Sequence, residues 1–236
     1  MPGAGSSTGA AVLALGLGLV VHWFRTAIDF FFSGDAKEIS DSYAVVTETF
    51  SGGREEWVDD VGRVASRHEG RGGTHTGLSA ALLVGDRIAD PAFCARLLDF
   101  LANALDGANP VFARVDHLNF QDTPDLEAAL RRTHRKYLSE SRTHLRGYSW
   151  ITGVPAEIAA RLGGAQRLSA TGAFHEVREL PGGGLLLQAI ETLAGYGDRA
   201  MREVFRALAP VLPPGIPEHD PARPDLRVVF EDASGV

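Results

Sequence analysis

A serine beside aromatic residues is the first candidate for chemistry in this chain. Residues 146–164 read RGYSWITGVPAEIAARLGG, and the letters around Ser149 begin like the G-x-S-x-G turn that carries a catalytic serine. That strained turn needs a small residue on both sides of the serine, but the second flanking position here is Ile151. We therefore expect Ser149 to be structural, in a strand over 148–152 that leads into a helix.

Histidines around a glycine-rich stretch, 69–77, are the second candidate. His68, Glu69 and His75 are the possible ligands, but two histidines seven residues apart across glycines cannot share a helix face as the H-E-x-x-H zinc site requires. The same glycines lack the Gly-Lys-Ser/Thr of a phosphate-binding loop. We expect a flexible, exposed loop here, with no metal or cofactor.

An acid–base set is the third candidate. Asp116, His117, Asp122 and His175 supply carboxylates and imidazoles, and a carboxylate that orients an imidazole is a common catalytic arrangement. Nothing in their spacing brings them together. With His75 they define the alternative to a binding protein, which is a small hydrolase or ligand-binding enzyme. We expect no catalytic residue among them.

Cysteine content and net charge narrow the classes of function. The single cysteine, Cys94, lies among apolar helical positions and is expected to be a core thiol. One cysteine excludes an internal disulfide and is typical of a reducing compartment such as the cytoplasm. With 23 Lys and Arg against 30 Asp and Glu, the net charge of −7 disfavours nucleic acid as a partner and is compatible with a basic protein partner.

A basic cluster follows a helix start at 123–125. Acidic residues precede this helix and basic ones follow, as the helix dipole favours. A solvated helix end is the expected reading, and a nucleic-acid patch is the alternative that the acidic composition disfavours. The cluster consists of Arg131, Arg132, Arg135, Lys136, Arg142, His144 and Arg146.

The N-terminal region is open to several interpretations. Residues 1–9 lack apolar content and should be disordered. Residues 10–24 form an apolar run that is shorter than the ~20 residues of a membrane-spanning helix. A buried strand or helix, a membrane anchor or signal, and a wrongly chosen start site all remain open.

Hydrophobic periodicity and turn residues predict alternating strands and helices. The expected strands cover 43–50, 78–84, 111–118, 148–152, two stretches around the glycine turn at 181–184, and an edge strand at 226–230. The expected helices cover 91–105, a segment from 123, 155–162 and 198–209.

These elements predict an α+β fold. We expect a mainly antiparallel sheet with helices on one face. Residues 40–236 would form a single domain, and the alternative is two similar units at 40–120 and 145–210.

Part of the chain resembles a known family. Trp150-Ile151-Thr152, Pro155, Leu162-Gly163-Gly164, AQRLSATGAF and GLLLQA are similar to the C-terminal part of the type VI immunity family, bacterial proteins associated with secreted antibacterial toxins. The resemblance covers about residues 146–190. It implies a protein without catalytic residues that neutralises a cognate toxin by occlusion, with acidic groups steering a basic partner and aromatic anchors supplying affinity.

Overall fold

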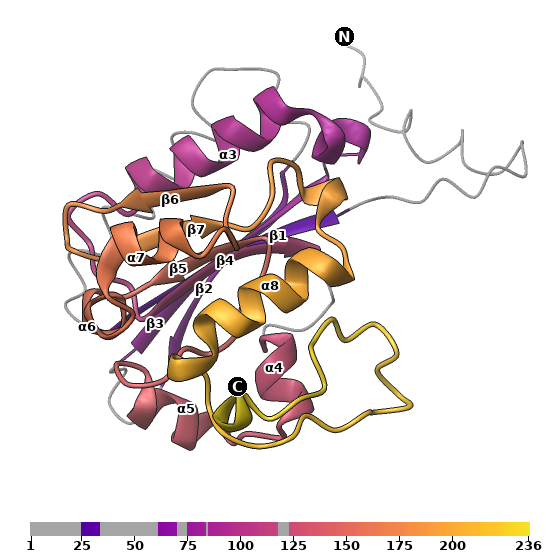
Figure 1. Cartoon of the computed structure of the whole chain (residues 1–236). Coiled ribbons are helices and arrows are strands. Elements are labelled where there is room, and N and C mark those ends of the chain that lie inside the picture. Colours follow the sequence, from indigo (N-terminus) through magenta and orange to yellow (C-terminus); the bar gives the residue numbers. More distant parts are fainter. Residues whose placement is uncertain (1–24, 34–60, 70–74, 84, 118–122) are drawn as a thin grey trace, which may run out of the picture.

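The structure is a computed structural model that describes residues 25–33, 61–69, 75–83, 85–117 and 123–236 (Figure 1). Segments 1–9 and 10–24 and the strand expected at 43–50 lie outside these residues. In the described part, seven strands form one antiparallel sheet in the order β2-β3-β1-β4-β5-β7-β6. The strands are β1 Arg25–Ser33, β2 Val61–Glu69, β3 His75–Leu83, β4 Phe112–His117, β5 Ile151–Val154, β6 Glu176–Glu179 and β7 Leu185–Gln188.

Helices pack around this sheet and confirm the α+β class. The α-helices are α3 Pro91–Ala104, α4 Asp125–Ala129, α5 His134–Glu140, α6 Ala156–Arg161, α7 Gly164–Ala170 and α8 Asp198–Leu208. Short 3-10 helices cover η1 Gly85–Ala89, η2 Leu193–Gly195, η3 Ala209–Val211 and η4 Ala233–Gly235. Strands of both predicted units pair in the one sheet, where β4 neighbours β5. The division into units stays a prediction.

Helices cover both faces of the central strands, whereas we expected them on one face. Every residue of β5 and β7 is buried. Asp99 of α3 contacts Arg178 of β6, and Arg146, the ion-pair partner of Glu127 in α4, stacks over Phe112 of β4. In the strand register Arg178 and Phe112 belong to opposite faces, so α3 and α4 lie on opposite sides (Figure 1). Continuous apolar strands such as LLLQ need cover on both faces.

The two ends of the glycine-rich stretch that we expected as a loop belong to strands. His68 and Glu69 end β2, and His75 begins β3. In the register Glu69 pairs with His75, so the connection is confined to 70–74. Residues that we predicted as loop from the neighbouring glycines pair as strands. The sheet supplies hydrogen-bond partners for their backbone, and local propensity does not predict such partners.

The helix predicted from 123 is broken into α4 and α5. Arg131, between them, has a left-handed φ of 49°, a conformation that cannot continue a right-handed helix. The N–H of Arg132 donates to the carbonyl of Glu127 and closes this turn. Charge order predicted the helical region but not the break. A second unexpected element is α7, which follows Gly163 at φ 84° where only a helix stop was expected.

Two predicted helices agree well with the structure. In α3 the carboxylate of Asp90 accepts from the N–H of Ala92, and Pro91 is the first helical residue, as the capping pattern indicated. In α8 the predicted apolar face is buried, although the N-cap is Gly197 and the predicted cap, Asp198, is the first helical residue. The buried residues of α8 are Ala200, Met201, Val204, Phe205 and Leu208.

The edge strand expected at 226–230 does not form. Instead of a neighbouring strand, side chains accept two of its backbone N–H groups. Arg227 donates to the Asp125 carboxylate at 2.9 Å and Val229 to the Tyr148 hydroxyl at 2.8 Å. A side-chain oxygen satisfies a buried N–H as well as a strand carbonyl does, so this segment is held without joining the sheet.

Trp150 is fully buried, as its position beside a strand and a capped helix predicted. Its exposure is 0%, and its indole Nε1–H donates to the carbonyl of Ile190 at 2.7 Å. The side chain therefore fills core volume and also ties the start of β5 to the segment after β7.

Replacing Trp150 should strongly destabilise the protein. Trp150→Ala leaves a large cavity, and we expect a loss of about 3–5 kcal/mol in the free energy of unfolding. Trp150→Phe keeps most of the volume but leaves the Ile190 carbonyl without its donor, so a smaller loss of about 1–3 kcal/mol is expected. Urea denaturation measures both. An alanine variant as stable as the parent would contradict the packing role.

Candidate functional site

The predicted acid–base residues lie apart in the sheet. His75 of β3 pairs with Ser33 at one end of β1, whereas Asp116 of β4 pairs with Ala27 near the other end. At roughly 3.3 Å per residue, these positions of β1 are about 20 Å apart. His75 therefore does not reach Asp116 or its neighbour His117.

His175 is also separated from this part of β4. It is exposed and immediately precedes β6, which lies three strands from β4, about 14 Å at the usual strand spacing. Asp122 lies outside the described residues. The described members of the set thus do not converge on one site.

Ser149 is a buried turn residue. Its side chain is 1% exposed, and its hydroxyl donates to the carbonyl of Ile151 at 2.5 Å. Its N–H donates to the hydroxyl of Thr152 at 3.0 Å. These local bonds compete with strand pairing, which explains why β5 begins at Ile151 and not at Tyr148, where we predicted it.

Cys94 is a core thiol in the structure as in the sequence analysis. It is 0% exposed, and its Sγ donates to the carbonyl of Ile88 at 3.5 Å. Burial raises the pKa of this thiol. The reactive thiolate is therefore disfavoured.

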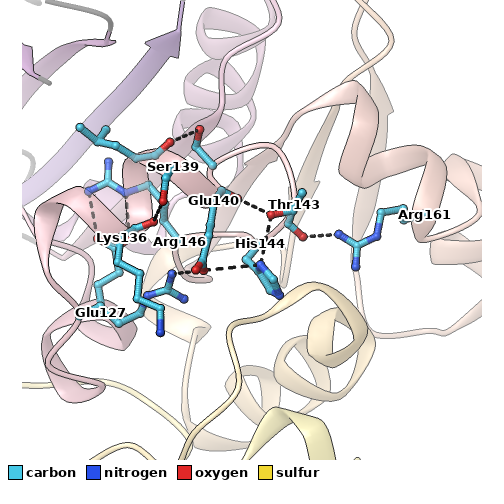
Figure 2. A network of polar contacts seen from close by, with 11 residues as sticks. Glu127, Lys136, Ser139, Glu140, Thr143, His144, Arg146 and Arg161 are labelled. Atoms are coloured by element: carbon cyan, nitrogen blue, oxygen red, sulfur yellow. Dashed lines mark hydrogen bonds and ion pairs between the residues drawn. The ribbon is translucent and has the colours of Figure 1, made fainter. Parts of the chain in front are cut away.

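A buried ion pair occupies the basic cluster that we expected to be solvated. Arg146 donates from Nε and from its terminal nitrogen to the two carboxylate oxygens of Glu127 at 3.2 and 3.1 Å. The side chains are 3% and 1% exposed. The guanidinium also stacks on Tyr137, 4.0 Å from the ring centroid, and Figure 2 draws the Glu127 and Arg146 side chains.

Burial dominates the electrostatics of Glu127. The loss of solvation raises the pKa of this carboxyl, while Arg146, Arg132 and Arg114 act in the opposite direction. A buried carboxylate needs such partners because an isolated charge is costly to desolvate. Arg146 is therefore structural, and the solvated reading was wrong for it.

A second, more exposed network surrounds Glu140 at the end of α5 (Figure 2). Its carboxylate is 2.6 Å from a terminal nitrogen of Arg132 and 3.7 Å from Nδ1 of His144. The Thr143 hydroxyl donates to the Glu140 carbonyl. Arg132 is 8% exposed, so the prediction of a solvated helix end was wrong for it as well. Lys136 is exposed, as predicted.

Two tyrosine hydroxyls differ in their partners near the C-terminal segment. Tyr148 accepts from the N–H of Val229, but the hydroxyl of Tyr196 is buried with no partner among the described residues. Burial raises the pKa of both phenols, and the Asp116 carboxylate adds to the effect at Tyr196. Both hydroxyls therefore stay protonated at neutral pH.

A proline-rich loop over 213–225 presents an exposed apolar residue on the surface. Ile216 is 68% exposed. The backbone around it is fixed, because the N–H of Gly215 donates to Asp232 and that of Glu218 to the Ala129 carbonyl. Further along, the His219 ring stacks on Phe230 with centroids 3.7 Å apart. This segment, which we call the C-terminal loop, projects from the body below α8 (Figure 1).

Acidic residues flank Ile216 on this loop. The exposed acids are Glu218, Asp220 and Asp225. Glu218 pairs with Arg131 at 3.0 Å and Asp225 with Arg223 at 3.1 Å, whereas Asp220 accepts from the N–H of Ala222. The loop therefore combines an apolar tip with one carboxylate, that of Asp220, that has no ion-pair partner among the described residues, a combination that suits a basic and partly apolar partner.

The sequence analysis missed both the buried pair and the exposed residue. Nineteen residues separate Glu127 from Arg146, and no periodicity links charges at that distance. Ile216 had a weak signal, since it stands between prolines in an otherwise polar segment.

Comparisons with known proteins extend this description. No family model matches the chain, and no curated protein sequence matches it. Its structure is similar to that of the Pseudomonas aeruginosa T6SS (type VI secretion system) protein PA0821, with a TM-score of 0.51 and 14% sequence identity. The match covers 87% of this chain and 79% of that one. At this identity the likeness shows a shared fold.

Membrane-spanning helices and metal-binding clusters are both absent from the described residues. None of the helices there is both long and apolar enough to cross a membrane. Over the same part of the chain, no group of three or more His, Cys, Asp or Glu residues is placed to hold a metal ion.

Breaking the buried ion pair should cost more than removing it entirely. Arg146→Met leaves Glu127 buried without its main partner, and we expect a loss of about 3–5 kcal/mol in unfolding free energy. In the double variant with Glu127→Leu, most of this loss should be recovered. Urea denaturation of the four proteins gives the coupling energy, and additive single effects would contradict a direct pair.

The Arg146→Met variant should also acquire a pH dependence. Without Arg146, the pKa of folded Glu127 lies further above its ordinary value of 4.5. Because the pKa of Glu127 is higher in the folded than in the unfolded state, the stability that this group contributes is fully present below pH 4.5. That contribution is lost as pH rises through the folded-state pKa. The deficit relative to the parent should therefore be larger at pH 8 than at pH 5.

The two tyrosines offer a matched test of hydrogen bonding. Tyr148→Phe leaves the buried N–H of Val229 without an acceptor and should lower the unfolding free energy by about 1–3 kcal/mol. Tyr196→Phe removes a hydroxyl that has no described partner, so stability should stay unchanged or increase. Equal losses in thermal and urea unfolding would show that Tyr196 has a partner as well.

Proposed function

We propose that this protein is an immunity-type binding protein that neutralises a bacterial toxin by protein–protein occlusion. Two observations support a type VI setting: the resemblance of residues 146–190 to the type VI immunity family, and a fold shared with a protein described as T6SS. Neutralisation by binding needs only a complementary surface. The partner is a cognate protein toxin.

The C-terminal loop is the observation that carries this proposal. Its apolar tip, Ile216, is exposed over 68% of its surface, and exposed apolar residues within a fixed loop are suited to fill a partner's pocket. The anchoring bonds from Gly215 and Glu218 hold the backbone before binding. Preorganisation lowers the entropy lost on association and thereby increases affinity.

Charge supports a basic partner. The net charge is −7, and the exposed acids Glu218, Asp220 and Asp225 follow the apolar tip along the loop. Complementary charges steer association and act more on the rate of binding than on final affinity. We expect the association rate constant to fall as ionic strength rises.

The proposal places the protein in the cytoplasm. A single cysteine that is buried and unpaired fits a reducing compartment. Attachment to a membrane through residues 10–24 is the alternative, and fractionation of cells that express the full chain separates the two.

Ile216→Glu tests the binding surface. The partner is the toxin encoded beside this gene, and calorimetry measures its affinity. Loss of a central apolar anchor should weaken binding by at least roughly tenfold. Val236→Glu is the matched control, because Val236 is also exposed, at 61%, and lies outside the loop. Both variants should melt like the parent.

Two outcomes would contradict the proposal. If Ile216→Glu binds the toxin with the affinity of the parent, the loop does not anchor the complex. A folded Ser149→Ala or His175→Ala variant that binds the toxin normally but no longer protects cells would instead mark an active site.

A further inference from the structure

We propose that a basic cluster at the end of α5 binds a small dianionic oxyanion of the phosphate type. We call it the α5 cluster: Arg132 and His144 contact the carboxylate of Glu140, Lys136 lies one helical turn before Glu140 on α5, and Arg161 donates to the carbonyl of Thr143, next to His144. This inference is independent of the proposed toxin binding. Of its residues, Arg132, Lys136 and His144 belong to the basic cluster of the sequence analysis, and none lies in the C-terminal loop.

Positive charge exceeds negative charge in the α5 cluster. Arg161 donates to the backbone carbonyls of Thr143 and Pro210, and these neutral acceptors leave its charge unbalanced. Lys136 is exposed, and its ammonium group has no ion-pair partner among the described residues. The carboxylate of Glu140 contacts Arg132 and His144 of the cluster. A dianion matches this surplus better than a monoanion does.

Unused donors accompany this surplus. Nε of Arg132 is buried and has no hydrogen-bond partner in the described part of the chain, which is costly for a guanidinium. The carboxylate of Glu140 already contacts both a terminal nitrogen of Arg132 and Nδ1 of His144. In the proposed complex the oxyanion would replace this carboxylate, which is 30% exposed and therefore accessible to solvent.

His144 links anion binding to pH. Burial and the cations Arg132, Arg161 and Lys136 lower its pKa, while Glu140 acts in the opposite direction. The ring is therefore neutral at pH 7. An oxyanion beside it favours the imidazolium, so binding of the dianion should be accompanied by the uptake of a proton at His144.

The test is a titration of the full chain with inorganic phosphate. Calorimetry measures the affinity, and NMR spectra monitor the ring signals of His144. Saturable one-to-one binding is expected at pH 8, where inorganic phosphate is mostly dianionic. Lys136→Ala should weaken it roughly two- to fivefold, as for an exposed charge pair. Glu140→Gln should strengthen it by a similar factor, because the internal competitor loses its charge.

Glu157→Gln is the matched control. Glu157 is also half-exposed and pairs with an arginine, Arg142, at 3.2 Å, yet it is not part of the α5 cluster. Its variant should bind phosphate like the parent, and thermal melting of each variant verifies the fold. Equal strengthening by both glutamate variants would indicate general electrostatics and overturn the site.

Acetate at the same ionic strength identifies the ligand class. Weaker binding of acetate than of phosphate supports a dianion site. Tighter binding of acetate would overturn the proposal. NMR signals that shift linearly with phosphate concentration, without saturation and at many surface arginines, would also overturn it.

Discussion

The buried ion pair of Glu127 and Arg146 constrains the half of the molecule that carries α4, α5 and the start of β5. Its two hydrogen bonds join α4 to the segment that enters β5. The rings of Tyr137 in α5 and of Phe112 in β4 both lie close to the guanidinium. Because neither charge can remain buried alone, these elements must keep their mutual positions.

The position of α4 in turn determines the course of the C-terminal segment. Asp125, at the start of α4, accepts the N–H of Arg227, and Ala129, at its end, accepts that of Glu218. The segment thus acquires backbone partners from a helix and from Tyr148 in place of a strand. The exposed loop with Ile216 is fixed by the same contacts, so the proposed binding surface depends indirectly on the buried pair.

The basic residues between 131 and 161 serve two different purposes. Arg146 is buried in the core and paired with Glu127, so its charge is not available to a ligand. Arg132 contacts the carboxylate of Glu140, which solvent still reaches, and Lys136 and Arg161 are exposed cations of α5 and α6. A single stretch of sequence thereby supplies both a structural ion pair and a surface suited to an anion, and only burial separates the two.

Local patterns in the sequence were enough to predict α3, the apolar face of α8, the hairpin of β6 and β7, the burial of Trp150, and the α+β class. Each depends on spacing or capping within a few residues. Tertiary structure decided the rest: the left-handed break at Arg131, cover on both faces of the sheet, the pairing of Glu127 with Arg146, the capture of 226–230 by Asp125 and Tyr148, and the separation of His75 from Asp116. These features join residues that are distant in the chain or depend on what packs above them, and a local pattern carries no information about either.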